Sequence, residues 1–308
     1  MTPFPIAETS TCSARSGMRD RPTLALLGVT AIWGSTFVVV KDAIAQMPVT
    51  DFLTWRFALA ALAMLVLRPR SVAALGAQGR RVGVLLGLAL GTGYLLQTLG
   101  LQHTSAAVSA FITGMFVVLT PLCGAVLLRQ APGAQTWGAV VVATVGLALV
   151  SLNGLSVGSG ELLTLGCAVA FALHIVGLGR WSASHDAFGL AVVQLLTTAL
   201  LCGLFAAPGG LALPPSPSVW GALALTALAA TALAFVVQTW AQAHLAPTRA
   251  AIVMTMEPVF GGLFAVLLAG EVLHLRVLLG AVLVLGAMIV TEVGPRQGAE
   301  GAVKRLEI

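Results

Sequence analysis

Two stretches of this chain decide its fold: YLLQTLGLQH, from Tyr94 to His103, and FVVQTWAQAH, from Phe235 to His244. Gln, Thr and His occupy the same three places in both, and the aromatic residues Tyr94 and Phe235 open them, at a constant separation of 141 residues. Apolar sequences can resemble each other through composition alone, but Gln and His are rare in apolar helices, so their repetition is hard to obtain in that way. We interpret the match as the trace of an internal duplication.

The composition places the chain in a lipid bilayer. Of its 308 residues, 58% are hydrophobic and only 9% are charged, and the mean hydropathy is +0.99. This leaves too little polar surface for a water-soluble protein of this size. Apolar runs of about 18 residues or more, the length that a helix needs to cross a membrane, recur along the sequence. They predict an all-α membrane protein with ten transmembrane helices, over residues 24–45, 50–67, 82–101, 105–128, 134–152, 162–179, 187–206, 219–241, 249–268 and 274–291.

The positions of the basic residues predict the orientation. With the N-terminus inside, thirteen of the 16 Lys and Arg residues fall on the cytoplasmic side, two (Lys41 and Arg276) fall on the other, and Arg56 lies within a span. Positive charge marks cytoplasmic loops, so we expect two cytoplasmic tails, residues 1–22, which we interpret as disordered, and 293–308. The same bias accounts for the basic pI of 9.6 without a nucleic-acid partner. The expected location is the bacterial inner (plasma) membrane.

The duplicated stretches fall in the third and the eighth predicted helices, so each repeat spans five helices, over residues 23–152 and 153–292. An odd number of crossings inserts the second repeat upside down relative to the first. Inverted repeats around a central cavity are typical of carriers that work by alternating access. Further pairs, at a separation of 138, are Phe52 with Leu190, Trp33 with Phe171, and Phe37 with Ile175.

Four segments give the chain a family resemblance: WGSTFVVVKDA from Trp33, TWRFALAALAMLVL from Thr54, TSAAVSAFITGMFVVLTPLCGAVLL from Thr104, and TRAAIVMTMEPVFGGLFAVLLAGE from Thr248. In order and spacing they resemble the drug/metabolite transporter superfamily, specifically its EamA-type ten-helix exporters, over residues 24–292. The resemblance implies a basket-like bundle, a cavity lined mainly by helices 1, 3, 4, 6, 8 and 9, and export of amino acids or related metabolites. One position departs from the family pattern. Many relatives carry an acid after the fourth helix, where this chain has Arg129-Gln130, whereas the second half keeps Gly270-Glu271.

Polar and aromatic residues deep in the predicted helices are candidates for substrate binding. Tyr94 and Gln97 are three residues apart, on one face of helix 3, and Phe235 with Gln238 repeats this arrangement on helix 8. Two amides that face each other across a cavity offer donors and acceptors, which suits a zwitterion. Alternatively, each Gln ties two helices together through a hydrogen bond.

Three further candidates lie on the first helix of each repeat. Trp33 and Thr36 lie on helix 1, and His174 on helix 6 corresponds to Thr36 at the separation of 138. Trp33 serves equally well as a packing residue. Burying even a neutral imidazole without a partner costs free energy, so His174 near the midplane is expected to have a role.

Arg56 in helix 2 and Glu257 in helix 9 are costly inside a membrane, so both are expected to be functional or structural anchors. Glu257 lies nine residues after Thr248, about 14 Å into its helix and near the midplane. Two interpretations stay open: an unpaired Glu257 carries a proton in each transport cycle, or Arg56 pairs with it and Glu257 is a fixed strut. Pro121 and Pro258 free backbone carbonyls in the middle of helices 4 and 9 and permit bends that gating could use.

Motifs of catalysis are missing from the sequence. It has no P-loop and no paired-carboxylate motif, and its histidines form no ligand pair at helical spacing with an acid, so we expect no catalytic residue, no metal, no cofactor and no direct use of ATP. Ser184-His185-Asp186 holds the letters of a catalytic triad, but adjacent residues do not form triad geometry. The four cysteines do not make a disulfide framework.

Together these features predict a secondary transporter that exports small metabolites from the cytoplasm, with the small molecule and the lipid bilayer as its partners. The aromatic and amide lining favours neutral amino acids, aromatic ones among them, over sugars or nucleotides. A membrane-embedded enzyme and a non-transporting membrane scaffold are the alternatives. An enzyme needs a convergent acid, base or metal cluster, and a scaffold does not need polar residues at matched depths in both halves.

Overall fold

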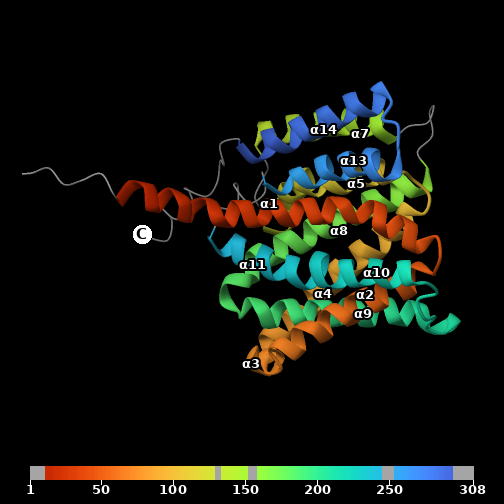
Figure 1. Cartoon of the computed structure of the whole chain (residues 1–308). Helices are drawn as coiled ribbons and strands as arrows, with labels where there is room; N and C mark the ends of the chain where they lie inside the picture. The colour runs from red at the N-terminus through yellow and green to blue at the C-terminus, as the bar shows by residue number, and fades with distance from the viewer. Residues whose placement is uncertain (1–10, 129–132, 152–157, 245–252, 294–308) are drawn as a thin grey trace, which may run out of the picture.

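The computed structural model describes residues 11–128, 133–151, 158–244 and 253–293, and within them every regular element is a helix (Figure 1). Seven helices are long and apolar enough to cross a membrane, by length and composition, and three shorter apolar helices complete the set. The seven are 21–44, 49–67, 76–101, 106–127, 159–181, 187–209 and 217–238, and the three are 137–149, 256–269 and 275–290. They coincide with the ten predicted spans, which confirms the expected class of fold.

Each repeat contributes five spans. The first repeat consists of α1 (Thr11–Ile44), α2 (Val49–Leu67), α4 (Gly76–Leu101), α5 (Ala106–Gly114) with α6 (Phe116–Leu128), and α7 (Ala134–Ser151). The second consists of α8 (Ser159–Trp181), α9 (Ala187–Ala206), α10 (Pro217–Ala224) with the π-helix η3 (Leu225–Leu233) and α11 (Ala234–His244), α13 (Met256–Ala269), and α14 (Leu275–Val293). The short elements α3 (Ser71–Ala74), η1 (Ser182–Ser184) and η2 (Ala207–Gly209) lie in the connections.

The packing of the helices follows a two-fold pattern. The first helix of each repeat packs against the third span of the other, so that α1 contacts α11 and α8 contacts α4. Equivalent helices of the two repeats also pack against each other, namely α2 with α9, α5 with α13, and α7 with α14 (Figure 1). Such reciprocal contacts are what an axis in the membrane plane between two inverted repeats requires.

The N-terminal helix starts earlier than the sequence suggests. α1 begins at Thr11 and continues through Pro22, so the expected disordered tail is wrong for residues 11–22. Three Arg residues, one Ala and one Met, all good helix formers, lie in this polar stretch, and Pro22 removes one backbone donor without ending the helix. The first ten residues and residues 294–308 of the predicted tails lie outside the described part of the chain.

The fourth and the ninth spans are interrupted, but not at their prolines. Met115 separates α5 from α6, and Thr255 precedes α13. Pro121 lies inside α6, whereas Pro258 is the third residue of α13, in the first turn, where a backbone N–H has no helical acceptor. Pro258 therefore does not bend the middle of a helix, contrary to the sequence-based expectation.

A polar network ties three spans together at the end of the bundle that holds Lys41. The carboxylate of Glu271 accepts the backbone N–H groups of Ala106 (2.8 Å) and Ala107 (3.1 Å), in the first turn of α5. The Lys41 ammonium donates to the carbonyl of Thr104 at 2.8 Å and lies 4.0 Å from Glu271. A carboxylate at a helix N-terminus satisfies donors that have no partner in the helix and complements the helix dipole. The corresponding Arg129-Gln130 of the first repeat lies outside the described residues.

Replacement of Glu271 by Gln should lower the thermal stability of the protein. A neutral amide keeps the size of the side chain but loses the charge at the helix N-terminus, an effect of about 0.5–2 kcal/mol. The measurement is the melting temperature in detergent. Asp42→Asn is the matched control, because Asp42 lies at the same end of α1, is exposed, and changes the net charge equally. Equal melting temperatures for the two variants would contradict the capping role of Glu271.

Candidate functional site

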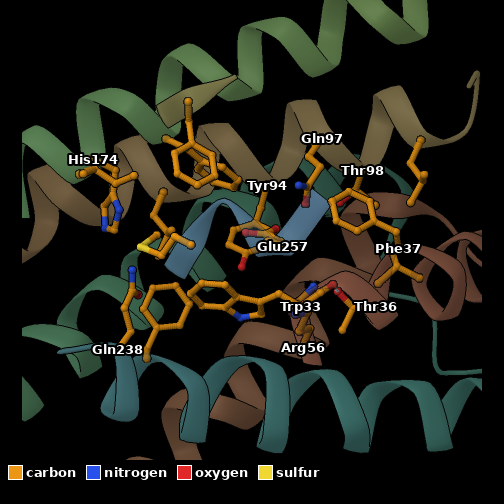
Figure 2. Close-up of a pocket in the computed structure, with 18 residues that line it drawn as sticks. Trp33, Thr36, Phe37, Arg56, Tyr94, Gln97, Thr98, His174, Gln238 and Glu257 are labelled. Atoms are coloured by element: carbon orange, nitrogen blue, oxygen red, sulfur yellow. Dashed lines mark hydrogen bonds between the residues drawn. The ribbon is translucent and has the colours of Figure 1, made fainter. Parts of the chain in front are cut away.

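A cavity lies between the two repeats, with about 690 Å³ of empty space that includes the open volume at its mouth. Side chains from α1, α2, α4, α6, α8, α11 and α13 line it (Figure 2). All seven residues predicted to bind substrate take part: Trp33, Thr36, Tyr94, Gln97, His174, Phe235 and Gln238. Of the predicted gating and coupling residues, Arg56 and Glu257 line the cavity, whereas Pro121 and Pro258 do not.

Several lining residues were not singled out from the sequence. They are Phe37, Val40, Leu90, Thr98, Leu101, Phe116, Phe171, Ile175 and Met254. The repeat itself contained the signal for four of them. Phe171 corresponds to Trp33 and Ile175 to Phe37 at the separation of 138, and Thr98 is identical to Thr239 at the separation of 141. The other apolar residues carry no mark in a sequence in which most residues are apolar.

Two aromatic pairs occupy corresponding places in the two repeats. The ring centroids of Trp33 and Phe235 are 6.1 Å apart, and those of Phe171 and Tyr94 are 5.2 Å apart. In each pair a residue of the first helix of one repeat meets the third span of the other. Gly93 makes room for the second pair, because a Cβ atom at this position would collide with the ring of Phe171.

Arg56 is a buried cation held by polar and aromatic neighbours. Its Nε donates to Thr231 Oγ1 at 3.0 Å, and its guanidinium carbon lies 4.8 Å from the ring centre of Tyr94 and 5.4 Å from that of Phe57. Only 2% of Arg56 is exposed. Cation–π contacts stabilise a desolvated guanidinium but do not neutralise its charge. Within the described residues no carboxylate lies within 4.0 Å of it.

Glu257 lies in the middle of the same cavity, beside Trp33 and Tyr94 (Figure 2). It is 8% exposed. Among the residues that the structure describes, no Lys, Arg or His nitrogen lies within 4.0 Å of its carboxylate. The alternative in which Arg56 pairs directly with Glu257 as a fixed strut is therefore wrong for this structure. The cavity therefore holds a carboxylate and a guanidinium that do not form an ion pair.

The two amides lie on opposite sides of Glu257 (Figure 2). Gln97 is half-buried, and its Nε2 donates to Thr113 Oγ1 at 3.2 Å, which links α4 to α5. Gln238 is buried on α11. The contact of Gln97 with Thr113 matches the helix-linking alternative, while both amides also border the cavity.

His174 is anchored by a partner that the sequence does not reveal. Its Nε2 lies 2.6 Å from Oε1 of Gln194, a buried residue of α9, whose own Nε2 donates to the carbonyl of Leu190 at 3.2 Å. A neutral His174 protonated on Nε2 donates this hydrogen bond. The pair links the first two helices of the second repeat and fixes the ring at the edge of the cavity.

Gln97→Ala and Gln238→Ala should each weaken substrate binding by about fivefold, the effect of one lost hydrogen bond of about 1 kcal/mol. Binding is measured on detergent-purified protein, and gel filtration monitors the folded fraction. Thr113→Val removes the helix-linking partner of Gln97 and leaves its amide in place. If Thr113→Val reproduces the loss of binding seen with Gln97→Ala, Gln97 has a structural role. If both Gln variants bind the substrate normally, both amides are structural.

No group of three or more His, Cys, Asp or Glu side chains that could hold a metal ion occurs in the described residues. The polar groups of the cavity instead comprise a guanidinium, a carboxylate, an imidazole, an indole N–H, amides and hydroxyl groups. Such a set suits reversible binding of a small polar molecule.

A sequence model of the EamA-like transporter family matches the chain twice, over residues 21–152 and 158–292. An uncharacterized transporter of Archaeoglobus fulgidus is 32% identical over 268 residues, which cover 87% of this chain and 84% of that protein. The uncharacterized transporter YyaM of Bacillus subtilis is 26% identical over 281 residues, covering 84% of this chain and 90% of its own. A solved crystal structure shares the fold, with a TM-score of 0.63 at 18% identity over 89% of this chain and 98% of the other. Because the family match covers both halves of the chain around the central cavity, this integral membrane protein belongs to the EamA-like transporter family.

Proposed function

We propose that this transporter exports neutral amino acids from the cytoplasm, with aromatic amino acids among its substrates. One observation carries the proposal: Arg56 and Glu257 line the same cavity, and neither has an ion-pair partner among the described residues. Isolated charges are costly inside a membrane. A zwitterion supplies both missing partners at once, its carboxylate to Arg56 and its ammonium to Glu257, without changing the net charge of the site.

The remaining surface of the cavity suits an apolar or aromatic side chain. Trp33, Phe37, Phe171 and Phe235 contribute rings to it. Aromatic groups prefer tilted or edge-on contacts of the kind that the protein already makes between these rings. Amide groups at Gln97 and Gln238 offer donors and acceptors to the backbone of a bound amino acid without adding a fixed charge.

Glu257 also offers a way to couple export to a proton gradient. On the cytoplasmic side the substrate ammonium replaces the proton on Glu257, and on the other side a proton replaces the ammonium. Each cycle then moves one zwitterion out and one proton in. The proton gradient and the membrane potential both drive this exchange, so no ATP is consumed.

Three ligands of one size test the proposal. Phenylalanine carries both charged groups, 2-phenylethylamine lacks the carboxylate, and 3-phenylpropionate lacks the ammonium. A charge-assisted hydrogen bond contributes about 1.5–3 kcal/mol, so phenylalanine should bind at least about tenfold more tightly than either analogue. If 2-phenylethylamine bound as tightly as phenylalanine, the protein would be a transporter of organic cations. Counterflow of labelled phenylalanine in proteoliposomes must accompany binding, since a scaffold or a membrane-embedded enzyme would show none.

The export direction depends on orientation, for which we propose cytoplasmic termini in the plasma membrane of a bacterial cell. Cysteines introduced at Ser218 and Gln78, both exposed and at opposite ends of the bundle, test this in a background without the four native cysteines. In intact cells an impermeant thiol reagent should label Ser218→Cys, and Gln78→Cys should react only after permeabilisation. The reverse pattern would overturn the orientation and, with it, the direction of transport.

A further inference from the structure

The third span of the second repeat contains a π-helical segment, η3, beside the cavity. Its nine residues, Leu225–Leu233, connect α10 to α11 within one continuous span. π-helical turns are rare and occur mostly as single turns, frequently at functional sites. Two side chains from the first repeat donate hydrogen bonds to consecutive residues of η3. Trp33 Nε1 donates to the carbonyl of Ala230 at 2.8 Å, and Arg56 Nε donates to the hydroxyl of Thr231 at 3.0 Å.

The hydroxyl of Thr231 differs in its role from those of the helical threonines that bond to their own helix. Thr226 in the same segment donates to the carbonyl of Ala222 at 2.7 Å, and Thr54 and Thr120 likewise donate to the carbonyl four residues earlier. Thr231 instead accepts a long-range hydrogen bond from a buried cation, and no part of Thr231 is exposed. Its oxygen is therefore part of the environment of Arg56.

This contact determines which edge of the guanidinium is available to a ligand. A guanidinium binds a carboxylate through two parallel N–H donors, either the edge that includes Nε or the edge formed by the two terminal nitrogens. Thr231 occupies Nε, and the rings of Tyr94 and Phe57 lie at 4.8 and 5.4 Å from the guanidinium carbon. The Tyr94 hydroxyl also forms a side-chain hydrogen bond with Arg56. Because Thr231 already binds Nε, an incoming carboxylate has to bind through the terminal nitrogens.

We propose that Thr231 is a positioning residue that orients Arg56 for bidentate recognition of a substrate carboxylate, and that it thereby determines specificity for carboxylate-bearing ligands over amines. The inference rests on the proposed function, because it assumes that Arg56 binds the substrate carboxylate. It extends that function to Thr231, which does not line the cavity and acts on the substrate through its hydrogen bond with Arg56.

The test compares three variants with the wild-type protein. Thr231→Val keeps the shape of the side chain and removes the acceptor, Thr231→Ser restores a hydroxyl, and Thr226→Val is the matched control. Thr226 lies in the same segment and is equally buried, but its hydroxyl bonds to its own helix. The readout is the ratio of the affinities for phenylalanine and 2-phenylethylamine on detergent-purified full-length protein. Melting temperatures monitor the fold.

Thr231→Val should weaken phenylalanine binding by about threefold to tenfold, the range for one hydrogen bond of about 1 ± 0.5 kcal/mol, and leave binding of 2-phenylethylamine unchanged. Thr231→Ser should restore the ratio, and Thr226→Val should not alter it. Equal losses for both ligands, or an unchanged ratio, would overturn the positioning role alone. If the wild-type protein itself does not prefer the carboxylate-bearing ligand, the proposed function and the role of Thr231 are both overturned.

Discussion

Glu257→Gln should reduce the uptake of amino acid in proteoliposomes by at least about tenfold and remove its dependence on pH. In the wild-type protein a falling pH protonates the carboxyl, which then no longer attracts the substrate ammonium, so binding should weaken towards acid pH. Gln has nearly the same shape but no charge and no proton to exchange. Loss of one charge-assisted hydrogen bond of about 1.5–3 kcal/mol corresponds to about tenfold or more.

The measurement is transport across a series of pH values and with an imposed proton gradient. Glu161→Gln is the matched control, since Glu161 is also a buried glutamate at 9% exposure but lies outside the central cavity and accepts a hydrogen bond from Thr104. This control should keep the pH dependence of the wild-type protein. If Glu257→Gln transports at the normal rate with the normal pH dependence, Glu257 is not the proton carrier and facilitated diffusion is the better account.

Arg56→Gln should weaken the binding of phenylalanine by at least about tenfold and leave 2-phenylethylamine nearly unaffected, because only the first ligand has a carboxylate for the guanidinium. Arg56→Lys keeps the positive charge but loses the planar fork of donors, so its affinity for phenylalanine should lie between those of Arg56→Gln and the wild type. The order of the three affinities for phenylalanine separates the contribution of the positive charge from that of the guanidinium geometry.

Arg68→Gln, at the C-cap of the helix that carries Arg56, is the control for this series. Arg68 forms an ion pair with Asp186 at 3.1 Å, with about half of its side chain exposed, away from the cavity. Exposed ion pairs contribute only about 0–1 kcal/mol, so both ligands should bind this variant as they bind the wild type. A loss for both ligands in Arg56→Gln, together with a lower melting temperature, would show that Arg56 supports the fold and does not recognise the carboxylate.

Much of the architecture was predictable from the sequence by itself. Composition and the length of the apolar runs determine a membrane protein with ten spans, because the thickness of the hydrocarbon sets the length of a helix. Polar and charged residues inside apolar helices stand out, because burying such groups in a membrane costs free energy. For this reason Gln97, Gln238, Arg56 and Glu257 could be singled out from the sequence, and the structure brings all four to one cavity. Their role in substrate binding stays a prediction.

Only the tertiary structure decided how these groups are paired. The contacts of Arg56 with Thr231 and of His174 with Gln194 join residues that are 175 and 20 positions apart. Most helices of this chain carry apolar residues on every face, so the periodicity of the sequence does not reveal which face of a helix packs against which neighbour. The π-helical segment and the absence of a direct pair between Arg56 and Glu257 in the described residues likewise depend on the packing of several spans against one another. Such contacts form between side chains on different helices, and no local sequence pattern encodes them.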